Sequence, residues 1–364
     1  MNFAWLFAEK FNCSLYRSEG AIFYFDAAEI KTAVWGDCGS IRSFSIQLIF
    51  RKEHDKRSMK RTKFLAVILA AAMLLTLLCA CNSQSGSEGS TAVTVTDMTG
   101  REITLDEPAT RVVALTAADC EILYALDAGD ALVGRGEYCD YPAEVLNVPS
   151  VQSGYETNIE QIIALEPQVL LMSTMAQTKE QVAQLEAAGI RVVVSDAQDI
   201  EGTYTAIEMI GTLMGKEKQA NTLVSGMKST FEELQKDAAG DGSETIYFEV
   251  SPLEWGLWTA GSSTFMNEVA EMLGLKNCFA DVKGWAEISE EQVLERNPDY
   301  ILTISMYSGE GPMPEEEIMG RAGWENVTAV QNGKILNLQN NELSRPGPRL
   351  VEGAKTLYEF VYEN

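Results

Sequence analysis

The longest regular pattern in the chain is an amphipathic stretch that covers residues 216–237. Apolar residues recur there at steps of three and four, while charged residues fill the opposite face. The apolar positions are Ala220, Leu223, Val224, Met227, Phe231 and Leu234. This period predicts one continuous helix of roughly 33 Å, long enough to reach from one small domain to the next. An ordinary surface helix would show the same stripe, so the flanking sequence must distinguish the two interpretations.

Before this stretch, short β-branched runs alternate with segments of helical spacing. A hairpin is predicted over 93–105, with its turn at Met98-Thr99-Gly100. Strands are predicted at 111–115, 132–134, 168–172 and 191–195, and helices at 117–126, 159–165, 178–188 and 200–214. Such alternation is typical of an α/β lobe with a mainly parallel sheet that is covered on both faces.

The same pattern starts again after Gly240-Asp241-Gly242. Strands are predicted at 245–250, 299–304 and 334–338, and helices at 264–273, 289–296 and 348–362. The two halves also share a motif, NIEQIIALEPQVLL at 158–171 and SEEQVLERNPDYIL at 289–302, at an offset of 131 residues. In each copy a helix N-cap, Asn158 or Ser289, precedes an apolar stripe, a proline and a buried strand.

These patterns predict an α/β fold of two similar lobes with mainly parallel sheets, joined by a single long bridging helix. We expect the N-terminal lobe at 92–215, the bridging helix at 216–239 and the C-terminal lobe at 240–364. Two lobes on either side of one helix leave a cleft between them, and such clefts are preferred sites for small ligands.

The N-terminal part of the chain does not show the strand–helix alternation of the two lobes. Residues 1–58 contain scattered aromatics without a clear period, and we regard them as a doubtful extension. Residues 59–80 are predicted to form a secretory signal, because they have a basic start that is followed by an apolar run. Residues 81–91, which begin with Cys81, are predicted to form a polar tether. Leu78-Cys79-Ala80-Cys81 resembles the bacterial lipobox, which implies that Cys81 carries lipid. A retained membrane anchor is the alternative, and both place residues 91 onward outside the cytoplasm.

Charge and side-chain inventory exclude several classes of function. From residue 81 onward the chain carries 17 Lys and Arg against 46 Asp and Glu, a net charge of −29, which excludes nucleic acid as a partner. The only histidine, His54, precedes the predicted signal, so Ser-His-Asp and His-based metal chemistry are missing from the mature part. Cys120, Cys139 and Cys278 are too few and too far apart in sequence for a disulfide framework, and we expect buried free thiols.

Several motifs together resemble one protein family. They are TDMTGREITL, RVVAL, GEYCDYP, SGYETNIE, the two repeated motifs above and SRPGPRLVEGAKTLYEF. From about Val93 onward the chain is similar to the substrate-binding proteins of ABC importers for ferric siderophores, haem and cobalamin. The resemblance implies capture of a bulky metal chelate outside the membrane and its delivery to a permease and its ATPase. It also implies a monomer that breaks no bond and holds no cofactor of its own.

The chain resembles the vitamin B12-binding members of this family most closely at several positions. By that resemblance Tyr138 and Trp285 line the cleft from opposite lobes, and Trp258 and Arg345 occupy further pocket positions. Aromatic faces can cover the broad disc of a chelate while an arginine meets its polar rim. Where the B12-binders carry a tryptophan before the NIE helix, this chain has a glycine beside Tyr155, which becomes a fifth ligand candidate. Core aromatics and a surface arginine are the alternative.

Two glutamates occupy equivalent places in the repeated helices. By resemblance, Glu160 and Glu291 each dock into an arginine pocket on one permease subunit, with Glu290 as a substitute for Glu291. A carboxylate at the first turn of a helix also favours the positive helix end, so a purely capping role is the alternative.

Two other classes of function, an enzyme and a structural protein, are alternatives to ligand binding. The same architecture occurs in metal chelatases and nitrogenase-like subunits, whose chemistry needs histidines or clustered thiolates that the mature part lacks. A structural surface lipoprotein is the third interpretation, and aromatics lining a cleft would argue against it. Among chelates, ferric siderophore and cobalamin rank as near equals. Haem ranks behind them because the usual axial histidine is missing.

Overall fold

The computed structural model describes residues 92–153, 157–174, 178–305, 311–338 and 341–363, together with three strands nearer the N-terminus. These strands are β1 (Ser14–Ser18), β2 (Ala21–Asp26) and β3 (Glu29–Ala33). They form an antiparallel sheet within a unit that covers Met1–Gln84, separate from Ser85–Asn364. The predicted signal at 59–80, Cys81 and Tyr155 lie outside the described residues.

The first lobe is built on a parallel five-stranded sheet in the order β10-β9-β6-β7-β8. Its strands are β6 (Val112–Ala114), β7 (Leu132–Gly136), β8 (Ser150–Val151), β9 (Val169–Met172) and β10 (Arg191–Val194). β6 and β9 are buried at every residue, which is what a parallel sheet covered on both faces requires. The predicted α/β alternation is therefore confirmed in this lobe.

Helices cover the two faces of this sheet in pairs. They are α3 (Ala117–Ala125), α4 (Ile159–Ala164), α5 (Lys179–Ala187) and α6 (Ile200–Leu213). Because successive strand residues point to opposite faces, Val112 and Ala114 share a core with α3 and α6, whereas Val113 packs with α4 and α5. The predicted hairpin is also confirmed as β4 (Val93–Thr96) and β5 (Glu102–Leu105), and β4 packs on α6.

The second lobe has a mixed sheet in the order β14-β12-β11-β15-β16, with β13 also paired to β11. Its strands are β11 (Thr245–Ser251), β12 (Trp258–Ala260), β13 (Lys276–Asn277), β14 (Trp285–Glu287), β15 (Tyr300–Thr303) and β16 (Ile335–Asn337). β12 runs antiparallel to both β11 and β14, while the other pairs are parallel. Sequence reasoning missed β12, β13 and β14 because two- and three-residue strands carry too few alternating positions to be recognised.

The helices of this lobe pack around two cores. They are α8 (Phe265–Met272), α9 (Glu290–Arg296), α10 (Pro314–Met319), α11 (Thr328–Asn332) and α12 (Leu350–Tyr362). Tyr247, Phe279 and Trp324 form the aromatic centre of one core, with ring centroids 5.5 and 6.5 Å from Tyr247. α8 and α12 contribute instead to the larger core that continues across the bridging helix.

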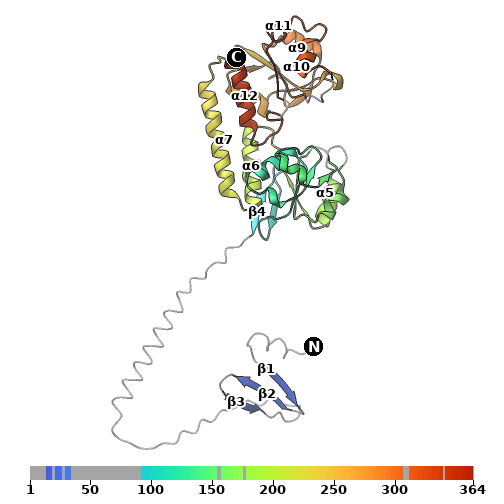
Figure 1. The fold of residues 1–364 in the computed structure, drawn as a ribbon, viewed down its shortest axis with the longest axis vertical. Coiled ribbons are helices and arrows are strands. Elements are labelled where there is room, and N and C mark those ends of the chain that lie inside the picture. The colour runs from blue at the N-terminus through green and yellow to red at the C-terminus, as the bar shows by residue number, and fades with distance from the viewer. Residues whose placement is uncertain are drawn as a thin grey trace, which may run out of the picture. The chain divides into compact units, whose positions relative to one another are not determined.

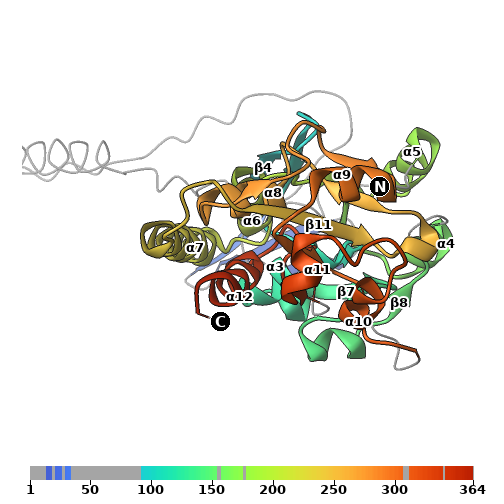
Figure 2. The ribbon, with the colours of Figure 1, turned by 90° about the horizontal axis from the view of Figure 1, so that it is seen from above.

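The bridging helix is confirmed as α7 (Glu217–Asp237), which runs along both lobes with α6 and α12 beside it (Figure 1). The view from above again places α7 and α12 next to one another (Figure 2). Five of the six predicted apolar positions are buried, and Leu223 is half-buried. Gly211 of α6 permits this packing, since a Cβ there would lie 2.5 Å from the Ala220 side chain. None of the described helices has the combined length and apolarity needed to cross a bilayer.

The repeated motif forms the same helix–strand unit in both lobes. Asn158 accepts a hydrogen bond from the Gln161 amide at 3.0 Å and caps α4, which leads to β9. Ser289 caps α9 in the same way through the Gln292 amide at 3.4 Å, and α9 leads to β15. The two lobes are therefore similar in their folding units, as the offset of the motif predicts.

Candidate functional site

The two lobes enclose a cavity of about 660 Å³. Residues 116–118, 173 and 195–198 line it from the first lobe, and each group begins within two residues of the end of β6, β9 or β10. Loops at the carboxyl ends of parallel strands are the usual ligand site of open α/β sheets. The second lobe contributes the end of β11 together with residues of β12, β14 and α8. We call this cavity the cleft.

The first lobe presents a polar wall to the cleft. Ser173, Ser195, Asp196 and Gln198 all lie on it. Asp196 accepts hydrogen bonds from the Thr174 hydroxyl and, at 3.2 Å, from the Gln198 amide nitrogen. The wall therefore offers hydroxyl, amide and carboxylate groups to a ligand.

The second lobe presents an aromatic wall. Trp258 and Trp285 lie on the paired strands β12 and β14, and Phe265 begins α8. The Phe265 and Trp285 rings are tilted by 58° with centroids 5.5 Å apart, and 40% of Trp258 is exposed. Both predicted tryptophans thus line the cleft, where their faces can cover a flat ligand.

Gln198 connects the two walls. Its side-chain oxygen accepts a hydrogen bond from Trp285 Nε1 at 3.1 Å, and its carbonyl accepts one from the Phe265 amide at 2.9 Å. Near it, the Ile200 amide donates to Glu268 at 2.7 Å. These three hydrogen bonds connect the two lobes, and the one from Nε1 fixes the orientation of the Trp285 ring.

Arg345 also lines the cleft, but its guanidinium is already paired. Its Nη1 lies 3.1 Å from Glu121 Oε1 and 2.6 Å from Asp140 Oδ1, and its Nη2 donates to the Tyr138 carbonyl at 3.2 Å. The Tyr138 side chain is 73% exposed and is not among the cleft-lining residues. Of the four ligand candidates that the structure describes, it brings three together in the cleft.

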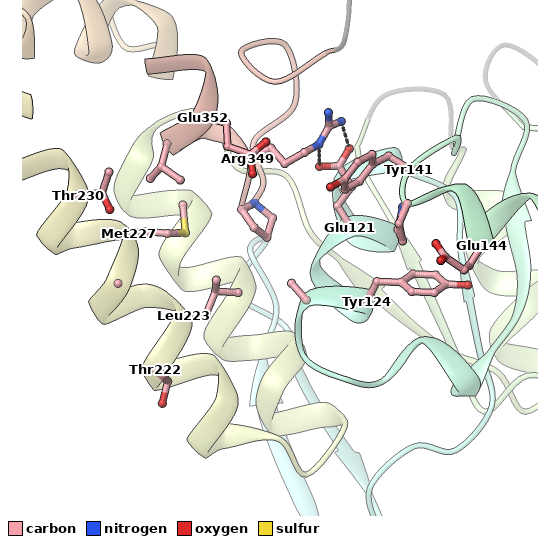
Figure 3. A pocket seen from close by; sticks show the side chains of 15 residues that line it. Glu121, Tyr124, Tyr141, Glu144, Thr222, Leu223, Met227, Thr230, Arg349 and Glu352 are labelled. Atoms are coloured by element: carbon pink, nitrogen blue, oxygen red, sulfur yellow. Dashed lines mark hydrogen bonds and ion pairs between the residues drawn. The ribbon is translucent and has the colours of Figure 1, made fainter. Parts of the chain in front are cut away.

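A second cavity of about 680 Å³ lies between α3, α7 and α12 (Figure 3). In it, Arg349 binds Glu121 through Nε at 2.9 Å and Nη2 at 2.6 Å. The Tyr141 ring lies 4.0 Å from the same guanidinium. Glu121 is therefore shared between an arginine of the cleft and an arginine of this second cavity.

The charged side chains that line the cleft are Asp196 and Arg345. Arg345 is paired with two carboxylates, Glu121 and Asp140, so the group that it forms with them brings no net positive charge to the cleft. The electrostatics of the cleft thus favour a ligand of low net negative charge.

A buried carboxyl group lies just below the cleft. Asp119 is 0% exposed and accepts a hydrogen bond from Thr116 Oγ1 at 2.5 Å. Burial, with a smaller contribution from the Asp196 charge, raises the pKa of Asp119 to about 6. No Lys or Arg of the described residues forms an ion pair with it.

Comparison with known proteins gives consistent results. The family model described as periplasmic binding protein matches residues 112–342. The chain belongs to the periplasmic binding protein family. It is 33% identical over 317 residues to an ABC transporter substrate-binding lipoprotein, YvrC, of Bacillus subtilis, covering 83% of this chain and 98% of that one.

Two further relatives of this periplasmic binding protein cover most of its described body. A vitamin B12-binding protein of Photorhabdus laumondii is 26% identical over 262 residues, which are 70% of this chain and 88% of that one. The structure of a possible iron-binding protein from Staphylococcus epidermidis has a TM-score of 0.58 and 32% identity, covering 70% and 100% of the two chains. The chain is thus a substrate-binding protein of the ABC transporter type, and these relatives are binding proteins rather than enzymes.

The two predicted docking glutamates of this periplasmic binding protein are exposed at equivalent helix ends. Glu160 lies in the first turn of α4 and Glu291 in the first turn of α9. Glu290 instead accepts a hydrogen bond from Trp324 Nε1 at 2.9 Å, which leaves Glu291 as the more accessible of the pair. Three residues after each exposed glutamate lies an exposed apolar side chain, Ile163 at 38% and Leu294 at 37%.

Sequence reasoning missed the polar wall, including Ser195, Asp196 and Gln198, as well as Phe265. The sequence signal for this wall was present, because a polar residue follows β6, β9 and β10 within two positions and such positions meet at one edge of a parallel sheet. The expected buried free thiols are confirmed for Cys120 and Cys139, while Cys278 is half-buried.

Proposed function

We propose that this protein is an extracytoplasmic lipoprotein that captures a metal chelate, a ferric siderophore or cobalamin, and delivers it to an ABC importer permease and its ATPase. The observation that carries this proposal is the opposition of the two cleft walls. Trp258 and Trp285 can cover one face of a broad, partly apolar ligand, while the serines, Asp196 and Gln198 meet its polar groups.

The charge of the cleft narrows the class of chelate. Cobalamin carries amides at its rim, and ferric hydroxamates hold iron through neutral or singly charged groups, so neither needs an excess of positive charge in the site. Haem propionates and ferric catecholates do need one, and the large negative charge of the chain disfavours them at long range as well. The likeness to a vitamin B12-binding protein and to a possible iron-binding protein supports the same two candidates.

The absorption spectrum of the protein purified with its native ligand tests this function directly, since corrinoid, haem and ferric hydroxamate colour it differently. Titration of the free protein with cobalamin, haem and a panel of ferric siderophores should follow, with tryptophan emission as the signal. We expect strong quenching by cobalamin or by a ferric hydroxamate. No response to any member of the panel would refute chelate capture.

We further propose that Glu160 and Glu291 dock the loaded protein on the permease, one glutamate per permease subunit. Their exposure at equivalent helix ends supports this role, and Ile163 and Leu294 give each glutamate an adjacent apolar contact. Glu160→Lys or Glu291→Lys should reduce uptake into cells and leave ligand affinity unchanged. Glu233→Lys, an exposed reversal on α7, is the matched control. A large loss of affinity in either docking variant would contradict the assignment.

Attachment to the membrane is proposed through Cys81, on the strength of the lipobox-like residues before it. Mass spectrometry of the protein extracted from membranes should find Cys81 as the modified N-terminus. An intact leader or an unmodified Cys81 would exclude lipid anchoring at this residue.

A further inference from the structure

One short segment separates the cleft from the second cavity. Residues 344–346 line the cleft, whereas residues 348 and 349 line the cavity between α3, α7 and α12. Arg345 and Arg349 point to the same partner, the Glu121 carboxylate, whose side chain is 2% exposed. A buried carboxylate with two arginine partners therefore joins the two cavities.

The two arginines hold Glu121 unequally. Arg349 binds both carboxylate oxygens, through Nε at 2.9 Å and Nη2 at 2.6 Å (Figure 3). Arg345 makes a single bond of 3.1 Å, to an oxygen that Arg349 already binds at shorter range. Because a two-point guanidinium–carboxylate pair is the strongest arrangement of these groups, Glu121 stays neutralised when Arg345 leaves it.

The other partners of Arg345 are easier to replace. The Asp140 side chain is 46% exposed, and an exposed ion pair contributes little to stability because water competes for both charges. The remaining partner is the carbonyl of the exposed Tyr138. An oxygen acceptor of a ligand in the cleft can therefore replace the partners of Arg345 without leaving a buried charge unpaired.

We propose that Arg349 is a positioning residue for ligand binding: by neutralising Glu121 it allows Arg345 to exchange Glu121 and Asp140 for an oxygen acceptor of the bound chelate. Arg349 itself lines the second cavity and does not line the cleft. The inference rests on the proposed function, because it requires a ligand in the cleft. It extends that function by assigning a role in affinity to a residue outside the ligand's reach.

Arg349→Met tests this exchange, because in the variant Arg345 is the arginine that still neutralises Glu121 and it can no longer leave Glu121 to bind the ligand. We expect the affinity for cobalamin or a ferric hydroxamate, whichever the wild type binds, to fall about tenfold, the effect of losing a hydrogen bond to a charged group. Glu121→Gln combined with Arg349→Met removes the buried charge and should restore most of the affinity. A residue that only maintains packing would show no such recovery.

Arg296→Met is the control for loss of an arginine ion pair, because Arg296 pairs at 2.6 Å with Asp281 and neither residue lines the cleft. It should lower the unfolding temperature without changing affinity. If Arg349→Met does not fold, Arg349→Gln, which keeps a donor but no charge, takes its place with the same expected outcome.

The possible results separate the two proposals. A wild type that binds neither chelate refutes the proposed function. A wild type that binds, with a single variant of equal affinity, overturns the exchange. The exchange is also overturned if the single variant is weakened and the double variant does not recover.

Discussion

The two lobes share one folding unit and yet present opposite chemistry to the cleft. In the first lobe, β6, β9 and β10 are all parallel, so the loops at their carboxyl ends meet and form the polar wall. In the second lobe, the antiparallel strands β12 and β14 bring Trp258 and Trp285 to the cleft from the strands themselves. The repeated motif therefore specifies the shared scaffold, whereas β12 and β14, which lie outside the repeat, provide the aromatic wall of the second lobe.

Two buried acids, one in each lobe, also differ in their partners. Glu249, which is 1% exposed, is held by Arg321 through bonds of 2.7 and 2.9 Å. Asp119, which is 0% exposed, has hydroxyl neighbours instead of a cation. Burial raises the pKa of both groups, that of Asp119 to about 6; Arg321 opposes the rise at Glu249, whereas no positive charge opposes it at Asp119.

The largest effect is expected from breaking the buried pair of the second lobe. Arg321→Met leaves Glu249 buried without its cation and should lower the free energy of unfolding by about 3 to 5 kcal/mol. Urea unfolding measures this change, and adding Glu249→Gln should recover much of it. Lys228→Met is the control, since Lys228 lies 4.0 Å from Glu201 and both are exposed, and it should cost under about 1 kcal/mol. An equal loss of unfolding free energy in Arg321→Met and Lys228→Met would contradict the expected difference between a buried and an exposed ion pair.

The unpaired acid of the first lobe should appear in the pH dependence of stability. Folding raises the pKa of Asp119 from its ordinary 3.8 to about 6, so its contribution to stability is present below pH 3.8 and is lost as the pH rises through 6. Relative to Asp119→Asn, the wild type should therefore lose about 2 to 3 kcal/mol between these pH values. Unfolding curves at several pH values measure the difference. Parallel pH profiles would show that Asp119 ionises normally in the folded protein.

The aromatic wall should dominate ligand affinity. Trp285→Ala removes a large aromatic face and the hydrogen bond to Gln198, and should weaken chelate binding by about 1 to 3 kcal/mol. Trp255→Ala is the control, because Trp255 is 76% exposed and does not line the cleft. Fluorescence or calorimetric titration measures the ligand affinity of both variants. An equal loss of affinity in both would contradict a specific role of the aromatic wall in binding.

The smallest effect concerns the bridging helix, which belongs to neither lobe. Gly226 lies within α7, and a Cβ there would meet nothing within 4 Å. Gly226→Ala should raise the free energy of unfolding by about 0.5 to 1 kcal/mol, because alanine loses less backbone entropy in a helix. A single thermal transition at a higher temperature would indicate that the helix and both lobes unfold together. A lower unfolding temperature would contradict the prediction, because it would mean that the alanine methyl group does not fit at this position.

The sequence by itself determined the longer helices, the longer strands and their grouping into two lobes. The stripe of α7, the buried strands and the caps Asn158 and Ser289 were all predicted, because periodicity and capping depend on residues within one or two turns of each other. The family resemblance placed Trp258, Trp285 and Arg345 in the cleft region, and the structure brings these three together there.

Only the tertiary structure decided which side chains meet. Trp285 and Gln198 are 87 residues apart in the chain, and Arg349 and Glu121 are 228 apart, so no local spacing connects either pair. Their contacts follow from strand order and from the packing of the C-terminal segment against α3. The antiparallel direction of β12 is likewise set by pairing with β11, because a three-residue strand has no direction of its own until a neighbour supplies its hydrogen bonds.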